Sequence, residues 1–196
     1  MAEVSTEIKG YDYANVARSP VTLDELRQLE ATVGFTDEDR RALRQAGRIL
    51  ESHAEELVDG WRAIIGRHEH LSRWFFGPDG KPDDAYKAAV KPRFVRWVVD
   101  LCTRPFDQAW LDYQHEIGLR HTPAKKNVVD ERGTPPVVPL RYLLAFIVPV
   151  ISSARTYLRN AAASPREAER MEVAWSKAVM LSVTLWSEPY AKEGLW

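Results

Sequence analysis

WLDYQHEIGLRHTPAKKN, residues 110–127, predicts a helix that ends in a histidine. Steps of three, four and four place four of its residues on one helical face: Trp110, Tyr113, Ile117 and His121. Pro123 disfavours helical geometry at Thr122, so we expect the helix to stop at or just after His121. A histidine on that last turn can be a core residue, a surface residue or a metal ligand, because a neutral imidazole is a good donor.

The composition indicates one domain with a substantial core. The chain has 196 residues, 45% of them hydrophobic, and its formal net charge of -1 gives no sign of a nucleic acid partner. Its single cysteine, Cys102, excludes an intrachain disulfide and is typical of a reducing compartment. The N-terminus has no apolar signal core, and the most apolar run, 137–151, is too short to span a bilayer. We therefore expect a cytoplasmic protein without a membrane-spanning segment.

Capping and stop signals predict an all-α chain, with a leader over residues 1–21 and a single domain over 22–196. Thr22 with Glu25 forms a capping box, and Thr36 is followed by acids where a helix dipole favours them. The predicted helices cover Thr22 to Gly34, Thr36 to Gly66 with a break near Ser52, 69–76, Asp83 or Asp84 to Leu101, Pro105 to His121, 139–160 and 164–187.

Several segments depart from a simple helical pattern. Pro92 lies inside one predicted helix and should kink or divide it, and Pro149 is a second expected kink.

The polar loop over 122–136 is long for a compact domain, and such loops are often functional or mobile. Residues 173–186 of the last helix are apolar nearly all round, so they must be buried on more than one side. Either a subunit interface or the preceding helix and the leader can cover them.

No residue pattern by itself establishes a catalytic or metal site. The chain has no Gly-rich phosphate loop, no HExxH motif and no paired cysteines. The chain has five histidines: His53, His68, His70, His115 and His121. No two of them have the spacing that would place a pair of metal ligands on one helical face. On spacing alone, His121 is also more often a core or surface residue than a ligand.

Seven segments, spread nearly end to end, carry a family resemblance: GYDY at 10–13, GW at 60–61, HLSRWFFGPDG at 70–80, RFVRWVVDLC at 93–102, FDQAWLDYQHEIGLRH at 106–121, PLRYLLAFIVPV at 139–150 and LWSEPY at 185–190. In these segments the chain resembles the protoglobins, single-domain haem proteins related to the sensor domains of globin-coupled sensors. The segment at 106–121 is long and specific, and it contains His121.

The resemblance implies a globin fold with an additional N-terminal helix and leader, and haem b (iron protoporphyrin IX) as the cofactor. It implies that His121 is the proximal iron ligand. The other pocket residues that it implies are Trp61, Arg62, Val90, Phe94, Phe146 and Val150. Val90 and Phe94 are one helical turn apart, as are Phe146 and Val150, so each pair can form one wall. Core packing alone would equally explain every apolar residue among them.

Two positions depart from the family pattern, which usually has a tyrosine at position 62 and a basic residue at 92. Arg62 can point inward and donate to a bound ligand, or extend outward and leave the pocket more apolar. The sequence leaves both open, and we favour the inward orientation because Trp61 is its neighbour. Arg93 lies about 100° round the helix from Phe94, where it can reach a haem carboxylate or remain a solvated arginine.

The function that the resemblance implies is reversible binding of a diatomic gas, such as oxygen, carbon monoxide or nitric oxide, at the haem iron. Alternatives are a haem enzyme (nitric oxide detoxification, peroxidase-like turnover or engineered carbene transfer), a stand-alone gas sensor, and a haem-free helical scaffold. A sensor would need a separate partner, because no output domain follows Trp196. The resemblance also implies a homodimer that forms through the last two long helices.

Overall fold

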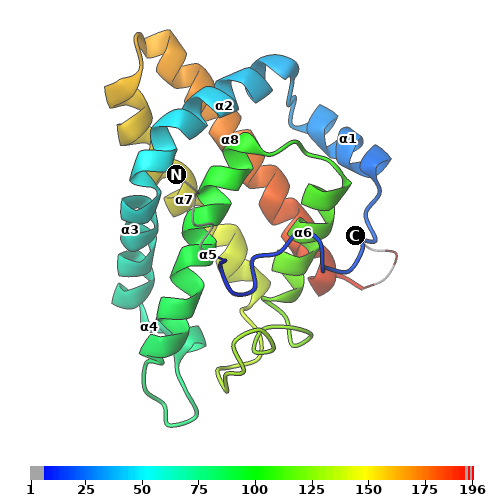
Figure 1. The fold of residues 1–196 in the computed structure, drawn as a ribbon, viewed down its shortest axis with the longest axis vertical. Coiled ribbons are helices and arrows are strands. Elements are labelled where there is room, and N and C mark those ends of the chain that lie inside the picture. Colours follow the sequence, from blue (N-terminus) through cyan, green and yellow to red (C-terminus); the bar gives the residue numbers. More distant parts are fainter. Residues whose placement is uncertain (1–6, 193, 195) are drawn as a thin grey trace.

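We describe a computed structural model, in which residues 7–192, 194 and 196 are placed. These residues form an all-α fold, as the sequence predicts (Figure 1). The helices are α1 (Leu23–Thr32), α2 (Asp37–Leu50), α3 (Ala54–Arg67), α4 (Glu69–Ser72), α5 (Asp84–Thr103), α6 (Gln108–Leu119), α7 (Leu140–Ala161) and α8 (Pro165–Ser187), with short 3-10 turns at Glu51–His53, Arg73–Phe75 and Glu188–Tyr190. Of the leader predicted over 1–21, residues 1–6 lie outside the described residues.

Local signals explain most of the helix starts. Thr22 forms the predicted capping box, in which its side chain accepts from the backbone three residues later. Thr36, predicted only to start a helix with acids in its first turn, also forms a capping box, with Asp39. Asp107 caps α6 in the same way, and Ser164 caps α8 ahead of a proline at its first position. The predicted break near Ser52 is the 3-10 turn between α2 and α3.

The two prolines inside helices do not divide them. α5 continues through Pro92 and α7 continues through Pro149. A proline inside a helix removes one backbone donor, and long helices with extensive packing tolerate that loss. Val90 and Phe94, on either side of Pro92, therefore remain on one helix.

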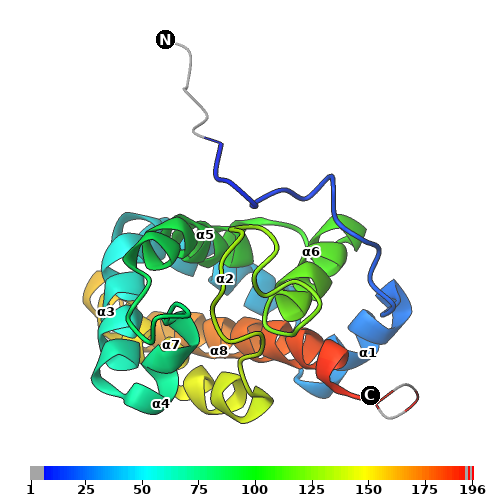
Figure 2. The ribbon, with the colours of Figure 1, turned by 90° about the horizontal axis from the view of Figure 1, so that it is seen from below.

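The helices pack in layers around a core rich in tryptophan. In Figure 2, α7 and α8 lie below α5 and α6, and the leader runs along the outer side of α5 and α6 towards α1. Trp110 and Trp175 are among the largest fully buried side chains. The residues that the structure describes include no helix that is both long and apolar enough to cross a membrane.

Close packing of α6 against α8 sets the position of the histidine. A Cβ built on Gly118 would lie only 3.0 Å from the carbonyl oxygen of Trp186 and 3.1 Å from Pro189. Gly118 is therefore needed for α6 to approach the end of α8 this closely. His121 follows three residues later, beside Trp186.

Candidate functional site

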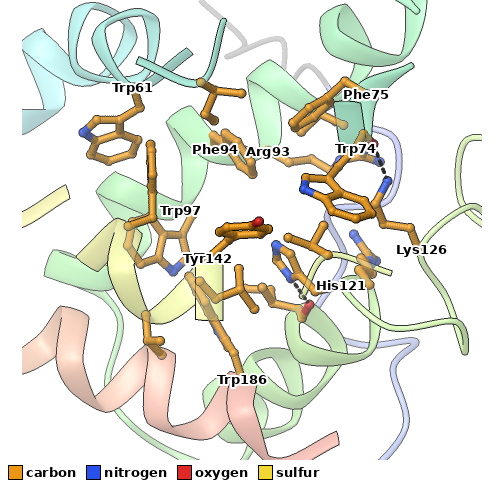
Figure 3. A pocket seen from close by; sticks show the side chains of 18 of the residues that line it. Trp61, Trp74, Phe75, Arg93, Phe94, Trp97, His121, Lys126, Tyr142 and Trp186 are labelled. Atoms are coloured by element: carbon orange, nitrogen blue, oxygen red, sulfur yellow. Dashed lines mark hydrogen bonds between the residues drawn. The ribbon is translucent and has the colours of Figure 1, made fainter. Parts of the chain in front are cut away.

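A large cavity lies between α3, α5, α6 and α7, with Trp186 of α8 in its wall (Figure 3). Its volume is about 220 Å³, whereas one buried water needs only about 10–15 Å³ on the same measure. The cavity brings together all but one of the residues expected from the sequence: Trp61, Val90, Arg93, Phe94, His121, Phe146 and Val150. Most of the lining is aromatic or aliphatic, which is typical of a site for a large apolar ligand.

The backbone of His121 is held on three sides. α6 ends at Leu119, two residues earlier than the sequence suggested, and His121 lies in the turn that follows. Its amide donates to the Gly118 carbonyl at 3.0 Å. Its own carbonyl accepts from the Val138 amide at 2.9 Å and from the Tyr190 hydroxyl at 3.0 Å. These bonds tie the histidine to the loop on one side and to the end of α8 on the other.

The ring of His121 has a defined tautomer. Nδ1 lies 2.8 Å from the carbonyl oxygen of Ile117, one turn earlier in α6. A carbonyl can only accept, so Nδ1 carries the proton and Nε2 keeps its lone pair. The ring stacks on Trp186 with its centroid at 6.0 Å and an interplanar angle of 19°. The hydrogen bond and the stacking together orient the imidazole, which borders the cavity.

Burial keeps His121 neutral. The residue is half-buried and lines the cavity. Desolvation by the surrounding protein is the largest of the effects that lower the pKa of His121 to about 4; the hydrogen bond to the Ile117 carbonyl opposes it, and the positive charges of Lys126 and Arg120 add to it. A histidine with such a pKa is an uncharged electron-pair donor at neutral pH.

Tryptophans form one continuous wall of the cavity. Trp97 lies between Trp61 and Trp186, with ring centroids at 6.3 and 5.4 Å. The indole nitrogen of Trp61 donates to the Ser153 hydroxyl at 2.7 Å. The indole nitrogen of Trp97 is buried and finds no hydrogen-bond partner among the described residues. The high tryptophan content of the sequence is thus concentrated partly at this site.

Arg62 is the expected residue that does not line the cavity. Its guanidinium lies 3.6 Å from Asp59, one turn earlier in α3, and its side chain is 33% exposed. It borders a separate, more polar pocket on the other side of Val90 and Phe94. The inward orientation that we favoured from the sequence is therefore wrong for this structure. Pairing with Asp59 near solvent avoids the cost of burying an unpaired guanidinium.

Arg93 does line the cavity, but Asp130 already neutralises its charge. The two terminal nitrogens of its guanidinium donate to the two carboxylate oxygens of Asp130, a bidentate pair in which both side chains are nearly buried. One of these nitrogens also donates to the Lys9 carbonyl at 3.3 Å. Arg93 therefore joins α5 to the loop over 122–136 and to the leader.

The leader closes the same side of the cavity. Gly10 has a φ of +75°, and a side chain there would collide with Val129 of the loop. The Gly10 carbonyl accepts from the guanidinium of Arg120 and, at 3.4 Å, from the hydroxyl of Tyr113. Tyr11 lines the cavity directly. The GYDY segment thus covers one side of the cavity, a role that its composition alone does not predict.

Sequence reasoning missed the charged residues Arg120, Lys125, Lys126 and Asp130 of the lining. Lys126 is 7% exposed although it lies in a polar loop. Its ammonium donates to the Trp74 carbonyl at 3.0 Å, the Tyr86 hydroxyl at 3.2 Å and the Thr134 hydroxyl at 2.9 Å. No local pattern predicts this burial, because it depends on how the loop folds back against α5.

Comparisons with known proteins agree with this architecture. The globin domain of a Geobacter sulfurreducens globin-coupled sensor is similar with a TM-score of 0.67 and 17% identity, over 85% of this chain and 97% of that chain. The ferrous globin domain of E. coli DosC is similar with a TM-score of 0.63 and 11% identity, over 84% and 99%. These similarities show a globin fold.

The sequence itself is matched at the level of a family. No curated protein matches the chain. The family model described as Protoglobin matches residues 22–196, which is most of the chain. The globin fold, the histidine in the turn after α6 and this match lead to one conclusion: the chain belongs to the protoglobin family.

Proposed function

We propose that the chain holds haem b in this cavity with His121 as the protein ligand to iron, and that it reversibly binds diatomic gases. Membership of the protoglobin family implies haem binding in general. The observation that carries the specific proposal is the neutral imidazole of His121, in which the bond from Nδ1 to the Ile117 carbonyl leaves the lone pair on Nε2. That arrangement is the one expected of a proximal histidine.

The chemistry of the lining also supports this proposal. A porphyrin is flat and largely apolar, and the lining supplies aromatic faces from Trp61, Phe94 and Trp186. The unpaired indole nitrogen of Trp97 is a polar atom that a polar group of a ligand could satisfy. The cationic residues of the lining, Arg93, Arg120, Lys125 and Lys126, lie on the side of the cavity that the loop over 122–136 forms. A porphyrin could direct its carboxylates towards that side.

Each part of the site has a separate role in this function. Bound haem supplies an open coordination position for oxygen, carbon monoxide or nitric oxide. The Ile117 carbonyl fixes the tautomer and orientation of His121, and the stacked Trp186 restrains the ring. Val90, Phe94 and their apolar neighbours exclude bulk water from the far side of the cavity.

A visible absorption spectrum tests the proposal. We expect a Soret band when the protein is loaded with haem, and its displacement in His121→Gly. Added imidazole should restore the original band, because it can occupy the space left by the side chain. The matched control is His115→Ala on the same helix, since His115 pairs with Glu188 at 3.1 Å and does not line the cavity. An unchanged spectrum in His121→Gly would exclude His121 as the ligand.

A stand-alone gas sensor in the cytoplasm is the second candidate function. Its support is that the two solved structures named above are globin domains, one from a globin-coupled sensor. The single buried cysteine is compatible with a reducing compartment. Binding of a partner protein that differs between gas-free and gas-bound protein would support this function.

The surface of the last two long helices supports a homodimer. Apolar side chains are exposed there on both helices: Leu144 (47%), Val148 (67%), Val173 (43%) and Met180 (40%). Leu144 and Val148 are one turn apart on α7, and Val173 and Met180 are two turns apart on α8, so each pair can share one face of its helix. Exposed apolar faces are typical of an interface between subunits. Val148→Glu should convert a dimer into a monomer in light scattering, and a wild-type monomer at micromolar concentration would contradict the homodimer.

A further inference from the structure

Four cationic side chains line the loop side of the cavity, and three of them have carboxylate partners. Arg93 pairs with Asp130, and Arg120 and Lys125 both pair with Glu116. The fourth is Lys126. Among residues 7–192, no carboxylate forms an ion pair with its ammonium. A buried charge without a counter-charge is costly, so its position in a ligand cavity requires an explanation.

The three hydrogen bonds of Lys126 satisfy its N–H groups but not its charge. All three acceptors are neutral: the Trp74 carbonyl and the hydroxyls of Tyr86 and Thr134. Asp130 is the carboxylate in the same wall, and both its oxygens are occupied by Arg93. Burial lowers the pKa of Lys126 to about 8, with Asp130 opposing the shift. The ammonium is thus less stable here than in water.

Tyr86 gives this position a second donor. Its side chain is 6% exposed and lines the cavity beside Lys126. The Tyr86 hydroxyl accepts from Lys126 at 3.2 Å, the longest of the three bonds, while its own proton faces the Lys126 carbonyl oxygen at a weak 3.5 Å. Burial raises the pKa of Tyr86 to about 12, so the phenol remains a donor. Lys126 and Tyr86 could both turn to one carboxylate by giving up only their weakest bonds.

We infer that Lys126, assisted by Tyr86, binds a carboxylate of the tetrapyrrole in this cavity and supplies the specificity for a free acid over its ester. Figure 3 shows Lys126 beside Trp74 at the edge of the cavity. This inference rests on the proposed function, and it moves the carboxylate contact from Arg93, expected from the sequence, to the neighbouring loop. The carboxylate supplies the counter-charge that Arg93 already has and Lys126 lacks.

Binding of iron-free protoporphyrin IX and of its dimethyl ester tests the inference, because neither needs the bond between iron and His121. The readout is porphyrin fluorescence during titration of the haem-free protein. Lys126→Met should weaken binding of the free acid about ten- to a hundredfold, the usual value of a hydrogen bond to a charged group. It should leave binding of the ester unchanged. Tyr86→Phe should also weaken binding of the free acid, by a smaller factor, and leave binding of the ester unchanged.

Lys87→Met is the matched control. It removes a lysine of α5 that is 29% exposed, pairs with Asp84 and does not line the cavity, so the affinity of this variant for both porphyrins should change less than about threefold. An unchanged affinity of Lys126→Met for the free acid would overturn the inference. So would an equal loss for acid and ester, which would mean that Lys126 only maintains the fold.

A measurement on the wild-type protein does not depend on how the variants fold. A carboxylate beside Lys126 raises the pKa of its ammonium, so binding of the free acid near pH 8.5 should take up protons. Calorimetry in two buffers of different ionisation enthalpy measures that uptake. Binding of the free acid without proton uptake would overturn the inference. If the wild-type protein binds neither porphyrin and gives no Soret band with haem, the inference fails together with haem binding. If it takes up haem but neither porphyrin, only the inference fails. Selective binding of the free acid with an unaltered haem spectrum in His121→Gly would contradict only the ligation by His121.

Discussion

The Nδ1 atom of His121 and the carbonyl oxygen of Ile117 are 2.8 Å apart, and they belong to residues one helical turn from each other. The carbonyl would otherwise be one of the unpaired groups at the end of α6. One hydrogen bond therefore completes the helix end and also fixes which ring nitrogen is free to bind a metal. A change that disrupts the end of α6 should therefore also disturb the candidate ligand.

The pH dependence of stability should report the burial of His121. Its pKa is lowered from 6.5 to about 4 in the folded, haem-free protein. Between these values the unfolded chain binds a proton that the folded chain does not, so stability should fall as the pH is lowered from about 6.5 to about 4. Urea unfolding of the haem-free protein at pH 7 and pH 5 measures the loss. His121→Leu should lose less stability over this interval, and an equal loss would contradict the prediction.

Gly118→Ala should destabilise the protein. The new methyl group would lie 3.0 to 3.1 Å from backbone atoms of Trp186, and such overpacking usually costs about 1–3 kcal/mol. Gly60→Ala is the control, because a Cβ at this exposed position of α3 meets nothing within 4 Å. Helix propensity alone should make Gly60→Ala neutral or up to about 1 kcal/mol more stable. The prediction is wrong if urea unfolding gives the two variants the same stability.

Arg62→Leu should leave the azide affinity of the ferric, haem-loaded protein unchanged within about twofold. The guanidinium pairs with Asp59 and does not line the cavity, so no charge that reaches a ligand is removed. An inward arginine would instead favour anions by about 1.5–3 kcal/mol. Spectroscopic azide titration of both proteins decides the matter. A tenfold loss of affinity in the variant would show that Arg62 reaches the cavity in solution.

Asp130→Leu should be strongly destabilising on its own. The change leaves the nearly buried guanidinium of Arg93 without its partner, and breaking such a pair usually costs about 3–5 kcal/mol. The double variant Arg93→Met with Asp130→Leu should recover much of that loss, since no unpaired charge remains. As a comparison, Arg155→Met removes a half-exposed partner of Glu172 and should cost less than about 1 kcal/mol. Additive losses in the double variant would argue against direct coupling.

Several parts of the fold were predictable because their causes are local. The caps at Thr22, Thr36 and Asp107 depend on residues within one turn, and the sequence contains all of them. The apolar stripe ahead of His121 likewise predicts which face of α6 is buried, and Trp110 and Tyr113 are indeed almost completely buried. The role of His121 itself came from the family resemblance, because periodicity does not distinguish a ligand from a core histidine.

Other features of the site depend on distant parts of the chain. Arg62 could point into the cavity or pair with Asp59, and it pairs with Asp59. The helical periodicity of the sequence does not distinguish these two orientations. The burial of Lys126 requires Trp74 and Thr134, which lie 52 and 8 residues away in the sequence, to meet it in space. Arg93 looked equally suited to a free carboxylate and to solvent, but it is committed to Asp130. Tertiary contacts settle each of these cases.

The contacts of Arg93 and Arg120 with the leader have a consequence for the rates of cofactor exchange. These two residues bind Lys9 and Gly10, and Arg93 also binds Asp130, so the leader and the loop over 122–136 are closed over one side of the cavity. A rigid macrocycle wider than the gaps between these segments can leave only when they open. The rate at which the cofactor dissociates would then be set by how often these segments open. Shortening the leader would accelerate transfer of the cofactor to another protein, even if the equilibrium affinity for the cofactor changed little.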